Sequence, residues 1–135
     1  MAADAAAAVV AAGAAVAKPR VLLVAPRDSY RTAPYIAAAR KQGVDLLIAS
    51  EGKLALSGLD LPGVQVNLHD APSSLQVVLT AAQAQPFAGV IGTDDASTEL
   101  AVLASMHLQL PHNPLLSVRL ARRKDLARSH LAGAG

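Results

Sequence analysis

The sequence contains no cysteine and no tryptophan, and its aromatic residues are limited to two tyrosines and one phenylalanine. The absence of cysteine excludes a disulfide scaffold, a thiolate nucleophile and any metal site held by thiolates. It is also compatible with a reducing compartment, and we expect a cytoplasmic protein. With so few aromatic residues, the core must be built from Ala, Val, Leu and Ile, which is typical of a parallel sheet covered by helices.

Several motifs of well-defined enzyme classes are also missing. No GxxxxGK[ST] phosphate loop and no GxSxG nucleophile elbow occur, and the four histidines lack the i, i+4 spacing of helical zinc ligands. The first apolar run continues as APRDS at 25–29 rather than as GxGxxG. Proline and arginine there would obstruct the close approach of a pyrophosphate. We therefore expect neither a P-loop enzyme nor a dinucleotide-binding Rossmann domain, and no metal ligands in this chain.

Positive charge is absent from a long central stretch, because no lysine or arginine occurs from Leu54 to Val118. Although the formal net charge is only +2, a cluster of basic residues follows, with Asp125 as its single acid. Such a cluster can attract nucleic-acid phosphates, but the chain offers almost no aromatic surface for base stacking. We therefore expect no nucleic-acid partner. The basic residues are Arg119, Arg122, Arg123, Lys124 and Arg128.

The first 19 residues form an alanine-rich segment of low complexity. Asp4 stands where a secretory signal would carry lysine or arginine. The apolar run from Ala5 to Ala17 has about 13 residues, whereas spanning a bilayer takes about 20. We predict a low-complexity extension over residues 1–19, one folded domain over residues 20–135, and no membrane partner.

Short apolar runs alternate with helical patterns along the folded part. Strands are predicted at 21–25, 44–49, 64–68 and within 87–93, with a loop at 52–62 that has room for one helical turn. Helices are predicted at 32–42, from Asp70 or Ser73 to 84, at 97–107, and from Asn113 to about 131. Thr32 and Asn113 are the expected N-caps, and Gly43 is the expected stop of the first helix.

Residues 108–112 fit either a frayed helix end or a fifth strand. The alternation predicts an α/β fold, an open parallel sheet of four to five strands with helices on both faces, similar to a Rossmann sheet.

Ligands of such sheets lie beyond the carboxyl ends of the strands. The loop after the first strand carries Arg27, Tyr30 and Thr32, and the loop after the fourth carries Asp94 and Asp95. We take these five as candidate substrate contacts. Asp94 and Asp95 could bind a cation or an amine, but carboxylates also suit a helix N-terminus, and we favour that capping role.

The last predicted helix is amphipathic. At about 100° per residue, Leu116, Leu120, Ala127 and Leu131 fall on one stripe, and Lys124 lies at its edge, with its ammonium beside Arg128. Lys124 is therefore either a surface lysine whose stem covers apolar area or a phosphate contact. Helical geometry alone leaves both roles open.

The end of the chain resembles the end of the N-terminal domain of ATP-grasp enzymes. Residues 110–114 read LPHNP, residues 121–128 read ARRKDLAR and residues 131–133 read LAG, where that family has LGLPGN, RNKDLMR and AG. His112 and Arg123 depart from the usual glycine and asparagine. The segment GTD at 92–94 and the helix after it agree with the family, and VLLVAPRDSYRT at 21–32 is similar to the opening of carboxylate-amine ligases.

This resemblance, carboxylate-amine ligase-like and biotin carboxylase-like, implies a pre-ATP-grasp domain truncated before the ATP-grasp fold. Such ligases use ATP and Mg²⁺ to convert a carboxylate to an acyl phosphate and pass the acyl group to an amine. Lys124 corresponds to the lysine that reaches the nucleotide phosphates, and Arg128 to a frequent basic position.

The partners implied are a small carboxylate, ATP and the missing ATP-grasp module, and this chain alone is expected to be inactive. Self-association is expected if its apolar face is exposed. The alternative is a stand-alone flavodoxin-like module that binds a small ligand without catalysis.

Overall fold

The computed structural model describes residues 18–27, 29–52 and 61–134. Nearly all of the predicted extension (1–19) lies outside the described residues, as does most of the predicted loop at 52–62 with its helical turn.

Four parallel strands form one open sheet in the order β3-β2-β1-β4. They are β1 (Arg20–Ala25), β2 (Asp45–Ser50), β3 (Gly63–Gln65) and β4 (Gly89–Gly92). The central strand β1 pairs with β2 on one side and with β4 on the other. After β1, the strands β2 and β3 are added on one side, and β4 is then added on the other side of β1. The strand order therefore reverses between β1 and β4. The predicted α/β fold with an open parallel sheet is confirmed.

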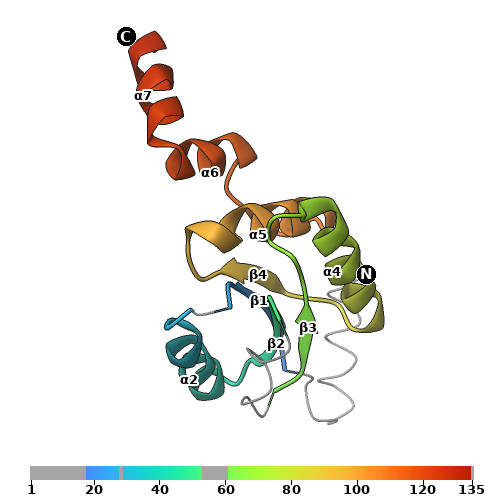
Figure 1. Cartoon of the computed structure of the whole chain (residues 1–135). Coiled ribbons are helices and arrows are strands. Elements are labelled where there is room, and N and C mark those ends of the chain that lie inside the picture. Colours follow the sequence, from blue (N-terminus) through green and yellow to red (C-terminus); the bar gives the residue numbers. More distant parts are fainter. Residues whose placement is uncertain (1–17, 28, 53–60, 135) are drawn as a thin grey trace.

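Helices cover both faces of this sheet (Figure 1). Side chains alternate between the faces along each strand. Leu22 and Val24 point into a core shared with α4 (Ala71–Ala84) and α5 (Asp95–His107). Leu23 points to the other face, where it joins Ile36 of α2 (Thr32–Gln42). All three β1 side chains are fully buried, so the predicted aliphatic core is what fixes the sheet.

Arg20 joins the start of β1 to the end of α4. Its guanidinium donates to the carbonyl oxygens of Ala81 at 3.3 Å and Gln85 at 2.5 Å. It also lies 4.6 Å from the ring centroid of Phe87. A cation is favoured there because the last carbonyl groups of a helix carry partial negative charge.

The starts of α2 and α5 differ from prediction, whereas the start of α4 agrees. Asp70 caps α4 as expected, since its carboxylate accepts from the backbone N–H of Ser73 at 3.2 Å. Thr32, the expected N-cap of α2, is instead its first residue, and Arg31 stands at the N-cap without a side-chain bond. The backbone carbonyl of Ser29 accepts from the Thr32 N–H at 3.4 Å, so the turn itself supplies the cap. Helix α5 begins at Asp95, two residues before the predicted start.

The third strand is shorter than predicted, because the chain turns at Asn67. The Asn67 carboxamide oxygen accepts from the His69 N–H at 2.9 Å, and its backbone groups bond to the buried hydroxyl of Ser74. Residues 108–112 form no strand. Gln109 has a left-handed φ of 57°, and Pro111 has no N–H to offer a neighbouring strand.

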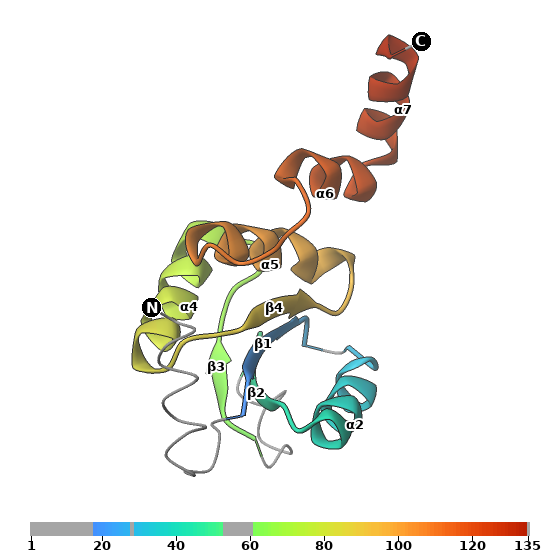
Figure 2. The ribbon, with the colours of Figure 1, turned by 180° about the vertical axis from the view of Figure 1, so that it is seen from behind.

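The prediction of one continuous last helix is wrong. The chain forms α6 (Leu115–Arg122) and α7 (Lys124–Gly133), separated by Arg123 in an extended conformation. Pro114, not Asn113, is the N-cap of α6, and its carbonyl accepts from Val118 at 3.2 Å. The predicted apolar stripe is thus divided between two helices. We call α6 and α7 the arm, and α7 leads away from the sheet in both views (Figures 1 and 2).

Candidate functional site

The loops after β1 and β4 are tied together where the strand order reverses. The Ser29 and Thr93 hydroxyl oxygens lie 3.2 Å apart, and the Arg31 guanidinium donates to the Thr93 carbonyl at 3.0 Å. Thr93 is buried, and its N–H continues the ladder by donating to Val24 at 3.0 Å. Sequence reasoning did not single out Ser29, Arg31 or Thr93, although a hydroxyl residue directly after a buried strand was the available signal.

Beside these loops, a cavity of about 270 Å³ opens between α2 and the carboxyl ends of β1 and β2. It brings together three of the predicted substrate residues, Arg27, Tyr30 and Thr32. Ser50, at the end of β2, also lines it and was not predicted. The full lining is Pro26, Arg27, Ser29, Tyr30, Thr32, Ala33, Ile48 and Ser50.

This cavity has a positive character. The described residues that line it include no carboxylate, and the first turn of α2 beside it carries no acid. The Arg27 guanidinium reaches across to the β2 loop, where its Nη2 lies 2.9 Å from the place a Cβ on Gly52 would occupy. Arg31 donates to the Tyr30 hydroxyl at 3.3 Å, and this bond raises the pKa of Arg31. Arg27 lines the cavity and Arg31 does not, so the Arg27 guanidinium and the N-terminus of α2 are the groups that suit a carboxylate or another small anion.

Asp94 and Asp95 do not join this cavity. Asp94 is the N-cap of α5, where its N–H donates to the Ser97 hydroxyl at 3.2 Å. The capping role favoured from the sequence is therefore the one that Asp94 has. Asp95 is exposed and lines a separate cavity between α5 and α6. Gly92 allows the end of β4 to pack closely against the first turn of α5, since a Cβ at position 92 would lie 3.1 Å from the backbone of Ser97.

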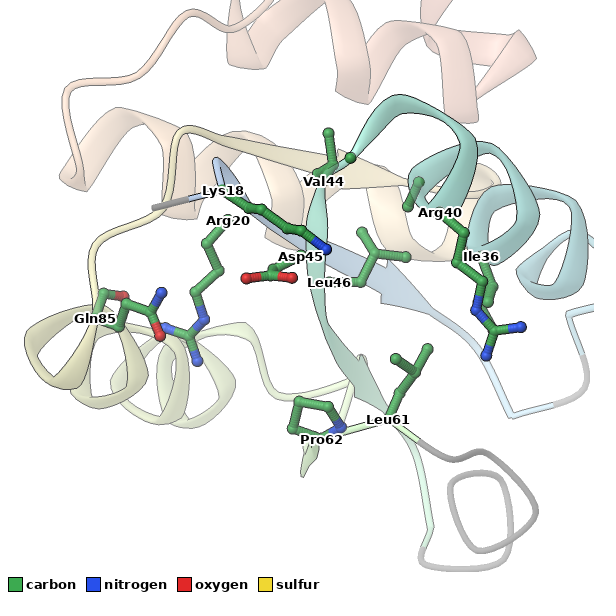
Figure 3. Close-up of a pocket in the computed structure, with 12 residues that line it drawn as sticks. Lys18, Arg20, Ile36, Arg40, Val44, Asp45, Leu46, Leu61, Pro62 and Gln85 are labelled. Atoms are coloured by element: carbon green, nitrogen blue, oxygen red, sulfur yellow. The ribbon is translucent and has the colours of Figure 1, made fainter. Parts of the chain in front are cut away.

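A larger cavity of about 410 Å³ lies at the amino ends of the strands (Figure 3). Lys18, Arg20 and Asp45 form one side of it, and Arg40 lies on the other. Its arginines have structural roles, because Arg20 binds the carbonyl end of α4 and Arg40 lies in the last turn of α2. Helix C-termini attract cations and disfavour anions. We therefore place the candidate ligand site at the carboxyl edge.

Three of the five basic side chains of the arm form ion pairs with carboxylates. Glu99 of α5 accepts from Arg119 and from Arg122, each at 3.0 Å. Asp125 accepts from Arg123 at 2.7 and 3.0 Å, and this pairing raises the pKa of Arg123.

Lys124 and Arg128 are exposed and make no ion pair with any residue that the structure describes. They lie four positions apart on α7 and so share one face. These are the two cations that the sequence resemblance assigned to the nucleotide.

Magnesium finds no ready-made site in the described part of the chain. Within residues 18–27, 29–52 and 61–134, no three histidine, aspartate or glutamate side chains come together as a metal site would require. In the same ranges, no helix combines the length and the hydropathy needed to cross a bilayer.

No protein-family model matches the sequence, and no curated protein matches it. Solved structures with a similar fold include an L-amino acid ligase from Bacillus licheniformis. The two share 19% sequence identity with a TM-score of 0.71, and the match covers 87% of this chain and 30% of that chain. The protein therefore has the fold of one part of an amino acid ligase, over somewhat less than a third of the ligase's length.

Proposed function

We propose that this chain is the amino-terminal domain of an ATP-dependent ligase that acts in the cytoplasm. The main support for this proposal is the fold that 87% of the chain shares with part of an L-amino acid ligase. The resemblance of residues 110–133 to the end of the ATP-grasp N-terminal domain supports the same reading from the sequence. Both point to a ligase.

In the proposed reaction, a carboxylate oxygen attacks the γ-phosphorus of ATP. The bond between that phosphorus and the bridging oxygen breaks, and ADP leaves. An amine then attacks the acyl carbon of the acyl phosphate, inorganic phosphate leaves and the amine proton passes to solvent. Positioning and charge neutralisation supply most of the catalysis in phosphoryl transfer. No three metal-ligating side chains come together among the described residues, and we propose that the magnesium ligands come from the ATP-grasp module.

The cavity at the carboxyl edge is the proposed carboxylate site. Arg27 supplies charge, Tyr30 supplies an exposed ring, and Thr32 lies at the start of α2. Lys124 and Arg128 on α7 are the proposed contacts to the ATP phosphates, since a lysine binds phosphate as a point charge.

The nucleotide half of the proposal is tested in the protein translated with its downstream coding region, obtained from the full transcript. We expect ADP release that depends on an amino acid. We also expect Lys124→Ala to weaken ATP affinity by about ten- to hundredfold, as loss of a charged hydrogen bond does. Arg40→Ala, which removes a cation at the opposite edge, is the matched control. Unchanged ATP affinity in Lys124→Ala would remove that residue from the nucleotide site.

A stand-alone binding module is the second candidate, because described residues of this chain alone line the positive cavity. Titration of the chain with L-amino acids, followed by NMR, separates the two. The module predicts shifts around Arg27 and Ser50 together with a stop codon directly after Gly135. The ligase domain predicts an open reading frame that continues.

A further inference from the structure

One carboxylate connects the arm to the body of the molecule. Glu99 lies on α5, and its side chain is 27% exposed. One of its oxygens accepts from the Arg119 Nε and the other from the Arg122 Nη1, both at 3.0 Å. The two arginines are three positions apart on α6 and so point from the same face of that helix. We call this arrangement the Glu99 clamp.

The apolar contacts of α6 are few. Val118 is its one buried side chain, whereas Leu116 is 59% exposed. A helix of eight residues is too short to be stable without tertiary contacts. Leu115 and Leu120 are half-buried, so the two charged hydrogen bonds of the Glu99 clamp add a directional tie to a small apolar contact.

The position of α7 depends in turn on α6. The main contacts of α7 with the described part of the chain are with α6, and both views show it pointing away from the sheet (Figures 1 and 2). Arg123 alone separates the two helices, and its two bonds to Asp125 fix the junction. The chain of contacts from the sheet to Lys124 therefore runs through α5, the Glu99 clamp and α6.

We propose that Glu99 is a positioning residue, which holds the arm at one orientation and so sets where Lys124 stands relative to the carboxyl edge of the sheet. The effect of Glu99 on ATP binding rests on the proposed function, whereas its effect on the orientation of the arm does not. Loss of the Glu99 clamp widens the range of positions that Lys124 samples.

The test is a distance measurement by double electron-electron resonance. Because the sequence has no cysteine, spin labels attach only at introduced sites, Gln83→Cys on α4 and Ala132→Cys on α7, both exposed. In Glu99→Gln, we expect the fraction outside the main distance peak to rise by about two- to fivefold, the range given by exposed ion pairs. Asp45→Asn removes one exposed negative charge at the opposite edge and should leave the distribution unchanged.

Two further measurements keep the proposal open to refutation if Glu99→Gln folds poorly. Raising the salt to about 1 M should broaden the distribution of the otherwise unmutated labelled chain, because exposed pairs are screened. Adding Glu99→Gln to Arg119→Gln/Arg122→Gln should produce no further broadening. An unchanged distribution in Glu99→Gln or in high salt would overturn the proposal. If the distribution broadens but the protein translated with its downstream coding region never binds ATP, the positioning role is upheld and the ligase is refuted.

Discussion

The sheet body and the arm are stabilised by different forces. In the body, residues such as Leu22, Leu23 and Val24 are fully buried, and α2, α4 and α5 cover the sheet with apolar side chains. In the arm, Val118 is the one side chain on α6 that is buried, and Leu131 of α7 is 69% exposed. The ion pairs between described residues all take their cation from the arm. Packing therefore fixes the body, while charge fixes the arm.

The largest expected effect is a core truncation in the body. Leu22→Ala removes a fully buried side chain from the central strand and should lower the free energy of unfolding by about 2–5 kcal/mol. The corresponding arm variant, Leu131→Ala, should change it by less than about 0.5 kcal/mol. Urea denaturation of both variants measures the contrast. Equal losses would mean that the arm shares the packed core.

Two glycines of β4 give the next contrast. A Cβ at Gly92 would lie 3.1 Å from the backbone of Ser97, which the α5 cap holds in place, so Gly92→Ala should cost about 1–3 kcal/mol. A Cβ at Gly89 meets no atom within 4 Å. Gly89→Ala should therefore be neutral or slightly stabilising. Thermal unfolding of the two variants compares them, and an undisturbed Gly92→Ala would show that α5 can move.

A smaller effect is expected where the body meets the arm. Gln109 follows α5 with φ of 57°, a conformation that costs an L-residue about 1–2 kcal/mol but costs glycine little. Gln109→Gly should stabilise the protein by about 0.5–1 kcal/mol. Gln109→Ala keeps the unfavourable backbone and should bring no gain, so any stabilisation by alanine would assign the effect to the side chain.

The smallest expected effect is that of pH on the arm. The Asp125 carboxylate raises the pKa of Arg123 by hydrogen bonding first and by its charge second. A base with a raised pKa keeps its stabilising contribution below its unfolded pKa and loses it only as pH rises through the folded pKa. Both values lie above the range from about pH 6 to pH 9.

The Cζ chemical shift of Arg123 should therefore stay constant across that range, with Arg128 as the reference arginine. A titration step below about pH 9 would contradict the raised pKa of Arg123.

Sequence reasoning succeeded where burial and backbone chemistry agree. The apolar run at 21–25 predicted β1, and Asp70 was one of the two predicted starts of α4. It failed at Arg123, because an amphipathic pattern continues through that residue without proline or glycine, although the residue is extended and pairs with Asp125. The prediction that Thr32 is the N-cap of α2 was also wrong, because its backbone N–H already donates to the Ser29 carbonyl in the turn before the helix.

The candidate site was predicted in part. The rule that ligands lie beyond strand ends selected Arg27, Tyr30 and Thr32, which line one cavity. It could not separate them from Asp94 and Asp95, because that separation depends on where α5 begins. The tie between Ser29 and Thr93 joins residues 64 positions apart, and local patterns do not reveal such a pair.

The central place of β1 also shapes how this protein emerges from the ribosome. The strand made first has one edge that stays unpaired until β4 follows, and Arg20 finds its acceptor on Gln85 only 65 residues later. Strand pairing over such sequence separations is slow, and the unpaired apolar strand edge can meanwhile contact other chains. The nascent chain thus carries a strand that is aliphatic from Val21 to Ala25 and has one unpaired edge until β4 is made, and chaperone contact is expected there rather than at the arm.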